Sequence, residues 1–275
     1  MSAIAIDWSG AKQPAAKIWM ACARDGHLDR LEAIPTRAEA IDQLGDALSH
    51  DRNSVAGLDF AFSFPAWFLR SCETLTVFDF WAVVAREGER WLHACAPPFW
   101  GRPGKKKPVG LVHYRRTEEL LRQTEQLAPK SCFQIGGAGS VGTGSIRGIP
   151  YLSQLREAGI AVWPFDRPRR PLVVEIYPRL LTGPPVKNSE AERTDYFAAS
   201  WITLASEHRD AAACDNAFDA AISALVMDRH IVEFEDLPLG DRMSRLEGEV
   251  WTPRFTLDEV FKASPRSHAR ASASC

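Results

Sequence analysis

The sequence predicts an α/β fold built on a mixed sheet, and two observations carry this prediction. Three short apolar runs each end in an acid, at Asp7, Asp59 and Glu175, and segments with helical spacing separate them. Such runs are typical of strands buried in a parallel sheet that helices cover on both faces. The dipeptide Asp25-Gly26 lies between two strand-like segments. It is a hairpin signal, so part of the sheet should be antiparallel.

The chain begins with three strands that we expect to form an antiparallel meander. Thr36, with Glu39 three residues later, forms a capping box that predicts the start of a helix, and Pro65 suits the first turn of another. We expect strands at 3–7, 17–23, 27–34, 55–59, 160–164 and 172–175. We expect helices at 36–48, from 65, and at 78–95, 117–127, 149–158, 194–206 and 215–227.

Length and charge are those of an ordinary globular chain. It has 275 residues and a formal net charge of −2, so no global charge attracts it to nucleic acid or membrane. We expect one domain over 1–255 with an insertion at about 65–160, and a disordered tail over 256–275. No apolar run is long enough to span a bilayer, and no secretory leader is visible. Together with six cysteines that form no Cys-x-x-Cys pair, this favours a cytoplasmic protein with reduced thiols.

The acids at the strand ends predict a shared site. Ligands of such sheets bind beyond the carboxyl ends of the strands, where Asp7, Asp59 and Glu175 would meet. On the helix at 215–227, Asp215 and Asp219 lie four residues apart on one face. Asp219 lies within an otherwise apolar helix and is expected to face inward, whereas Asp215 is as well explained as a helix cap. Clustered carboxylates favour Mg²⁺ or Mn²⁺ and suit a two-metal mechanism.

Further residues near these acids are candidates for contacts with a phosphate. Ser9 follows the first strand and should order the turn there. The glycine-rich stretch 136–145 is either a flexible crossover or a phosphate-binding loop, since backbone N–H groups can hold phosphate. Lys130 and Arg147 flank that stretch, and Lys187 follows the strand that ends in Glu175.

The segment 102–116 is basic, and it includes Lys105 and Lys106. Aromatic residues lie close to its cations, which suits stacking on bases and pairing with phosphates. The alternative is a charged surface loop. The aromatic residues are Trp100, His113 and Tyr114, and the arginines at 167, 169 and 170 are candidates for the same surface.

Four short motifs carry a resemblance to a known family. They are Ile4-Ala5-Ile6-Asp7-Trp8-Ser9-Gly10, Gly57-Leu58-Asp59-Phe60-Ala61, Val174-Glu175-Ile176-Tyr177-Pro178 and Phe218-Asp219-Ala220-Ala221-Ile222-Ser223-Ala224. These motifs resemble domain-of-unknown-function family 429 (DUF429), a predicted-nuclease branch of the ribonuclease H-like superfamily, over about residues 3–253.

The resemblance implies a five-stranded sheet, ordered 3-2-1-4-5 with strand two antiparallel, and metal-dependent phosphodiester hydrolysis. Asp7, Asp59 and Asp219 match acids that bind metal in the superfamily. Glu175 departs from the ribonuclease H pattern, in which the second acid lies on the first helix, where this chain has Glu39.

The leading hypothesis is therefore a nuclease that uses Mg²⁺ or Mn²⁺ held by Asp7, Asp59, Glu175 and Asp219, with nucleic acid as its partner. A nucleotide-binding phosphotransferase or hydrolase on the same scaffold is the first alternative. A non-catalytic module that binds nucleic acid or protein is the second.

Overall fold

The computed structural model describes the chain except for residues 16, 125–127, 138, 184–188, 200–207 and 255–275. Lys187, the second half of the helix expected at 194–206 and the whole of the expected tail lie outside the described residues. The strands are β1 (Ala3–Asp7), β2 (Ile18–Arg24), β3 (His27–Ile34), β4 (Val55–Leu58), β5 (Ala161–Val162) and β6 (Leu172–Glu175). The helices are α1 (Arg37–His50), α2 (Ala66–Ser71), α3 (Val77–Ala94), α4 (Arg116–Thr124), α5 (Val141–Glu157), α6 (Pro178–Thr182), α7 (Glu190–Ala199), α8 (Asp210–Ala213), α9 (Asp215–Arg229) and α10 (Ser244–Glu247), with a 3₁₀ turn, η2, at Ile231–Glu235.

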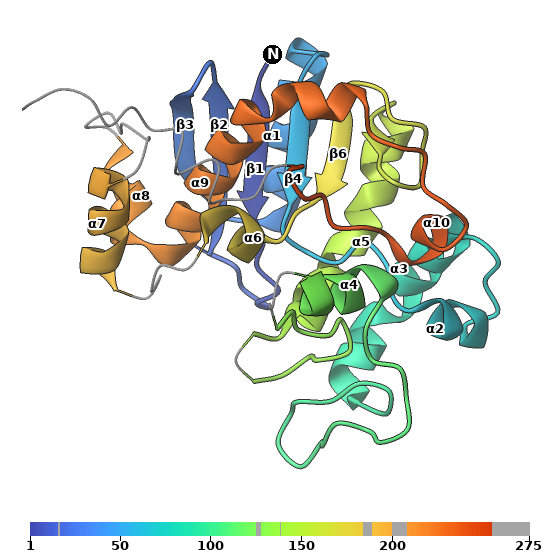
Figure 1. Ribbon diagram of the computed structural model, residues 1–275. Helices are drawn as coiled ribbons and strands as arrows, with labels where there is room; N and C mark the ends of the chain where they lie inside the picture. The colour runs from blue at the N-terminus through green and yellow to red at the C-terminus, as the bar shows by residue number, and fades with distance from the viewer. Residues whose placement is uncertain (16, 125–127, 138, 184–188, 200–207, 255–275) are drawn as a thin grey trace, which may run out of the picture.

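The strands form one mixed sheet in the order β3-β2-β1-β4-β6-β5 (Figure 1). β2 pairs antiparallel with both of its neighbours, as predicted, and the other pairs are parallel. The expected five-stranded order is wrong. The short strand β5 pairs only with the outer edge of β6, so the acid-tipped strand β6 lies next to β4 and β5 becomes the edge of a six-stranded sheet.

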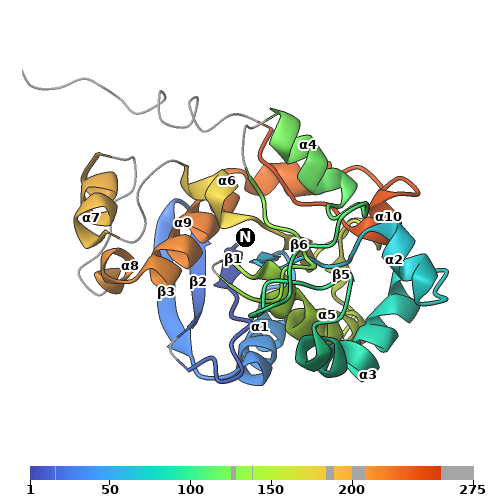
Figure 2. The ribbon, with the colours of Figure 1, turned by 90° about the horizontal axis from the view of Figure 1, so that it is seen from below.

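Helices cover both faces of the sheet, and each face has its own core. α9 packs on β1, β2 and β3 on one face, and Ala3, Ala5 and Val55 belong to the core beneath it. Ile4 and Ile6 belong to the opposite core, which α1, α3 and α5 complete. Figure 2 looks onto the carboxyl ends of the parallel strands, with α9 and α6 on one side of the sheet and α1 and α5 on the other. The alternation follows from the two-residue period of a strand.

The capping box that was predicted for the first helix is present. Thr36 Oγ accepts a hydrogen bond from the backbone N–H of Glu39 at 3.1 Å and donates one to Glu39 Oε1 at 2.9 Å. Ile41, Leu44 and Leu48 are buried against the sheet, as their spacing predicts. Local sequence therefore determines both the start and the buried face of α1.

The glycine-rich stretch differs most from its prediction. α5 begins at Val141 rather than at 149, so half of the expected loop is helix. The glycines there permit close contact between segments: a Cβ atom on Gly142 would lie 2.1 Å from the backbone oxygen of Cys132, and one on Gly148 would lie 2.7 Å from the ring of Phe60. Glycine lowers helix propensity, and the tertiary contacts of α5 override that preference.

Candidate functional site

Asp7 and Asp59 lie side by side at the carboxyl ends of two parallel strands. The register pairs Ile6 with Leu58, and the N–H of Asp59 donates to the backbone oxygen of Ile6 at 3.1 Å. The next residue on each strand is an aspartate, so the two are level. Neighbouring strands are about 4.8 Å apart, and level residues point to the same face. Asp7 is buried and Asp59 half-buried.

Helix α9 brings Asp219 to the same end of the sheet. Near the start of the helix, Asn216 Nδ2 donates to the backbone oxygen of Lys17 at 3.0 Å, and Lys17 directly precedes β2, which begins beside the end of β1. Near the end of the helix, Asp228 Oδ2 accepts from the N–H of Gly26 in the β2–β3 turn at 2.7 Å. The helix thus runs antiparallel to β1 on the face of Asp7, with Asp219 in its first turns.

Tyr177 links these acids electrostatically. Burial raises the pKa of the Tyr177 phenol, the Asp59 and Asp219 carboxylates raise it further, and the Arg179 guanidinium opposes them. Both carboxylates and a cation are therefore close to one phenol. Neither Tyr177 nor Arg179 was predicted as a site residue; both follow the β6 acid closely, and Tyr177 belongs to the motif Val174-Glu175-Ile176-Tyr177-Pro178.

Glu175 faces the other way. It is level with Leu58, not with Asp59, so its side chain leaves the strand on the face opposite to Asp7 and Asp59. Arg115 holds both of its oxygens, with Nη1 to Oε2 at 2.8 Å and Nη2 to Oε1 at 2.5 Å, and the N–H of Phe62 donates to Oε2 at 3.0 Å. Glu175 therefore does not point to the face of Asp7 and Asp59, and its ligand role stays a prediction.

Arg115 is the centre of a buried charge cluster with Glu118 and Glu175. Its Nε donates to Glu118 Oε1 at 2.9 Å, and its backbone N–H donates to Glu118 Oε2 at 2.8 Å. Burial raises the pKa of Glu118 because two carboxylates share one guanidinium in a dry environment. The cluster borders a small cavity of about 40 Å³ that Asp59 and Lys130 also line.

The turn after β1 is held by hydrogen bonds. Ser9 Oγ accepts from the N–H of Ala11 at 3.2 Å, as expected of a turn-ordering serine. Arg37 Nη1, from α1, donates to the backbone oxygens of Ser9 and Ala11 at 3.0 and 2.8 Å. Arg37 was not predicted as part of this region.

Arg147 clamps the same turn from α5. Its Nη1 donates to the backbone oxygen of Gly10 at 2.5 Å, and its Nε and Nη2 donate to the Glu89 carboxylate at 2.7 and 3.0 Å. Its side chain is 12% exposed. The guanidinium that was predicted to contact substrate is thus occupied by groups of this chain and shapes the turn.

The remaining predicted site residues are all exposed. Asp215, the first residue of α9, is exposed, and its Oδ1 accepts from the N–H of Asn216 at 3.0 Å. Lys130 is exposed, with its stem along Gly139 and the small cavity beside it. Lys105 and Lys106 are exposed on the loop before α4.

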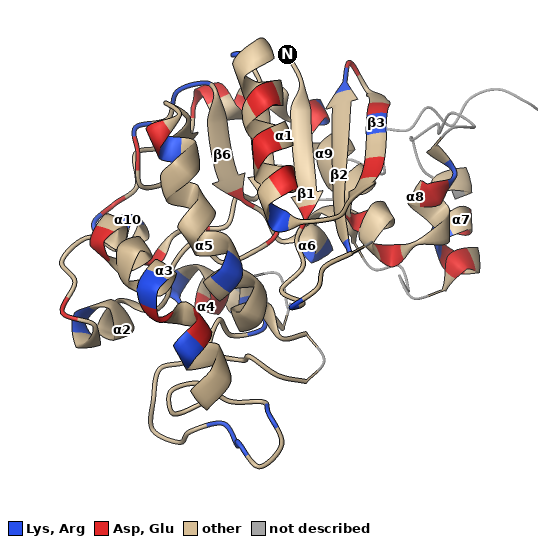
Figure 3. Cartoon of the chain, turned by 180° about the vertical axis from the view of Figure 1, so that it is seen from behind, with Lys and Arg blue, Asp and Glu red and all other residues tan. Residues whose placement is uncertain are grey.

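That loop is basic, but its aromatic rings have partners within the chain. Figure 3 shows Lys and Arg along the long loop that ends at α4. Trp100 and His113 are buried, and the Nζ atom of Lys107 lies 5.5 Å from the ring centroid of Trp100 and 5.0 Å from that of Tyr114. Stacking of these rings on bases is therefore not supported, whereas contact of Lys105 and Lys106 with phosphates stays a prediction.

The arginines at 167, 169 and 170 do not extend this basic surface. They lie on the loop before β6, at the amino end of that strand, whereas Arg115 at the end of the basic loop reaches its carboxyl end. Arg170 donates to the backbone oxygens of Asn53 and Ile231 at 3.0 and 2.8 Å. The expected joint surface is thus divided between opposite ends of the sheet.

Comparison with protein families, with curated proteins and with solved structures found no match to this chain. Among the described residues, no group of three or more His, Cys, Asp or Glu side chains is arranged so that it could hold a metal ion. Within the same part of the chain, no helix has the length and apolar character needed to cross a membrane.

Proposed function

We propose that the protein is a divalent-metal-dependent nuclease of the ribonuclease H-like type, related to the domain-of-unknown-function family 429. The observation that carries the proposal is the level placement of Asp7 and Asp59 on parallel strands, with α9 and Asp219 over the same face. The mixed sheet, with its antiparallel second strand, is compatible with that superfamily.

The chemistry of the donors fits a hard cation. Asp7, Asp59 and Asp219 offer only carboxylate oxygens, which Mg²⁺ and Mn²⁺ prefer over the nitrogen and sulfur ligands typical of zinc. When bound, such a cation would supply Lewis acidity toward a phosphodiester. Neighbouring carboxylates repel one another unless a cation or a proton lies between them, so a bound cation would relieve the repulsion between Asp7 and Asp59.

The residues of the chain provide the remaining roles. Arg179 lies close enough to Tyr177 to lower its pKa, and we propose it as a contact for a phosphate oxygen. Lys130, exposed beside the small cavity that Asp59 lines, is a second such cation. Lys105 and Lys106 lie on a loop without acids between 101 and 112 and suit the backbone of a longer polyanion. Glu175 and Arg115 act as positioning residues beneath the site.

Cleavage assays test the proposal. Single-stranded, duplex and hybrid oligonucleotides are incubated with the protein and Mg²⁺ or Mn²⁺. Asp7→Asn, Asp59→Asn and Asp219→Asn should each lower kcat/KM by about a hundredfold or more, because even groups that only support metal ligands are worth about 10–100-fold. The exposed Asp42 on α1 provides the matched control Asp42→Asn, which should leave cleavage unchanged.

Two outcomes would overturn the proposal. One is a wild-type protein that is inert with both ions on all three substrates. The other is cleavage by the three aspartate variants at the rate of the Asp42→Asn control.

A further inference from the structure

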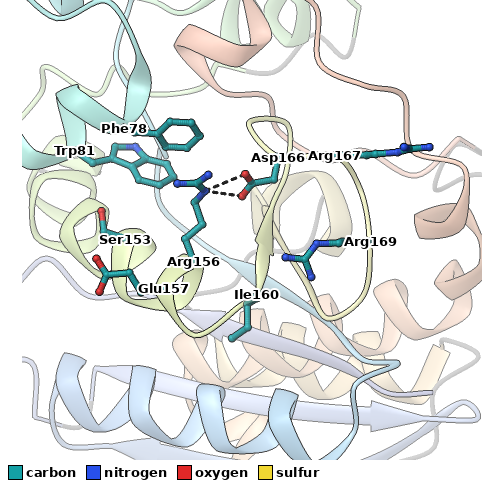
Figure 4. Close-up of a pocket in the computed structure, with 9 residues that line it drawn as sticks. All are labelled: Phe78, Trp81, Ser153, Arg156, Glu157, Ile160, Asp166, Arg167 and Arg169. Carbon is teal, nitrogen blue, oxygen red and sulfur yellow. Dashed lines mark hydrogen bonds and ion pairs between the residues drawn. The ribbon is translucent and has the colours of Figure 1, made fainter.

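A second cavity lies away from the acids. It has a volume of about 520 Å³ and is lined by α3, by the end of α5 and by the loop between β5 and β6 (Figure 4). That loop precedes β6, so the cavity lies toward the amino end of the strand whose carboxyl end carries Glu175. Its volume is in the range of small-molecule sites, about 300–1,000 Å³.

Arg156 is held rigidly in the wall of this cavity. Its Nε lies 2.9 Å from each oxygen of Asp166, and its guanidinium carbon lies 3.7 Å from the ring centroid of Phe78. Asp166 is fixed in turn, because its Oδ2 accepts from the N–H of Val162 at 3.1 Å. The two terminal nitrogens of Arg156 make no hydrogen bond with the part of the chain that the structure describes. An arginine that is stacked and fixed through Nε presents those donors at little entropic cost.

Two further arginines add positive charge that no acid in the described part of the chain neutralises. Arg169 Nη1 donates to the backbone oxygen of Gly159 at 2.9 Å. Over the described residues, neither Arg169 nor Arg167 forms an ion pair with an acid. In Figure 4 the Arg169 guanidinium points toward Ile160 and Arg167 extends outward at the rim. The lining holds three arginines against two acids, Glu157 and Asp166, and Asp166 is already paired with Arg156.

We propose that this cavity binds a small phosphomonoester with an apolar ring, at a site separate from the one that contains Asp7 and Asp59. A phosphomonoester carries a charge of about −1.5 to −2 at neutral pH, opposite in sign to the net positive charge of the lining, which has three arginines and two acids. Its oxygens accept hydrogen bonds from Arg156 and Arg169, since guanidinium groups are suited to paired contacts with phosphate. The half-buried ring of Phe78 and the side chain of Ile160 form the apolar part of the wall.

Isothermal titration calorimetry tests this site with phenyl phosphate, inorganic phosphate and phenol at physiological salt. Phenyl phosphate should bind the wild-type protein more tightly than phosphate, and phenol should not bind detectably. Arg169→Gln should raise the Kd for phenyl phosphate about tenfold, the value of one charge-assisted hydrogen bond, and Arg167→Gln/Arg169→Gln should raise it further. The control is Arg86→Gln, an exposed arginine of α3 that pairs with Glu87 and should leave the Kd within about twofold.

The proposal is overturned if phenyl phosphate does not bind, if it binds no more tightly than inorganic phosphate, or if Arg167→Gln/Arg169→Gln binds it like the Arg86→Gln control. The site does not depend on the proposed nuclease activity, because the titration needs neither a divalent ion nor cleavage. Loss of activity in Asp7→Asn should accordingly leave the titration unchanged.

Discussion

At the carboxyl ends of the parallel strands, the acids on the two faces of the sheet have different surroundings. On the face covered by α9, Asp59 and Asp219 are half-buried and lie close to Tyr177. On the other face, Glu175 is 3% exposed and bound by Arg115 and a backbone N–H. All three residues are acids at the same end of the sheet, so the type of side chain does not explain why their surroundings differ. The face does, because one step of register reverses the direction of a side chain.

We expect the largest change in stability when Arg115 is replaced, because Arg115 binds the acid on one face only. Arg115→Met leaves the buried carboxylates of Glu118 and Glu175 without their cation, so the free energy of unfolding should fall by about 3–5 kcal/mol. Urea denaturation measures it. Arg116→Met is the neighbouring control: its ion pair with Asp241 is half-exposed, and its loss should cost at most about 1 kcal/mol. Equal effects of the two substitutions would show that the buried cluster has no special role.

A pair of isosteric substitutions compares the faces directly. Glu175→Gln removes charge from a carboxylate with three hydrogen bonds, so the free energy of unfolding should fall by about 1–3 kcal/mol. Asp59→Asn relieves repulsion from the neighbouring carboxylates, which offsets part of what its own contacts lose, so it should lower the free energy of unfolding by less than Glu175→Gln does. Both follow from urea denaturation without divalent ions. A loss in Asp59→Asn as large as that in Glu175→Gln would contradict the contrast between the faces.

The smallest predicted effect is a pH dependence of the free energy of unfolding, which arises from Glu118 in the buried cluster with Arg115 and Glu175. Burial raises the pKa of Glu118 above its ordinary value of 4.5. As pH rises from that value, the unfolded chain loses this proton before the folded one does, so the contribution of Glu118 to stability falls with rising pH until its folded pKa is passed. Glu118→Gln should remove this decline. Unfolding free energies of both proteins between pH 4 and 8 measure it, and parallel profiles would contradict the assignment.

Local patterns predicted most of the elements correctly. The capping box at Thr36, the strand at Ala3–Asp7 and the helix that carries Asp219 depend on neighbours in sequence, and the structure confirms each of them. The α5 start at Val141 was missed because Gly142 and Gly148 make room for Cys132 and Phe60, and the sequence does not show which segments pack against them. A glycine that makes room for another segment is indistinguishable, in sequence, from one that makes a loop.

The residues of the candidate site also fall into those that the sequence predicts and those that only the tertiary structure explains. The sequence by itself determined that acids end the strands and that Asp7 and Asp59 belong together, because apolar runs and strand direction are local properties. Only the tertiary structure decided that Glu175 turns to the opposite face and that Arg147 is occupied by Gly10 and Glu89. Register and ion pairing join residues far apart along the chain, and the pattern of one segment holds no information about the partner that another will supply.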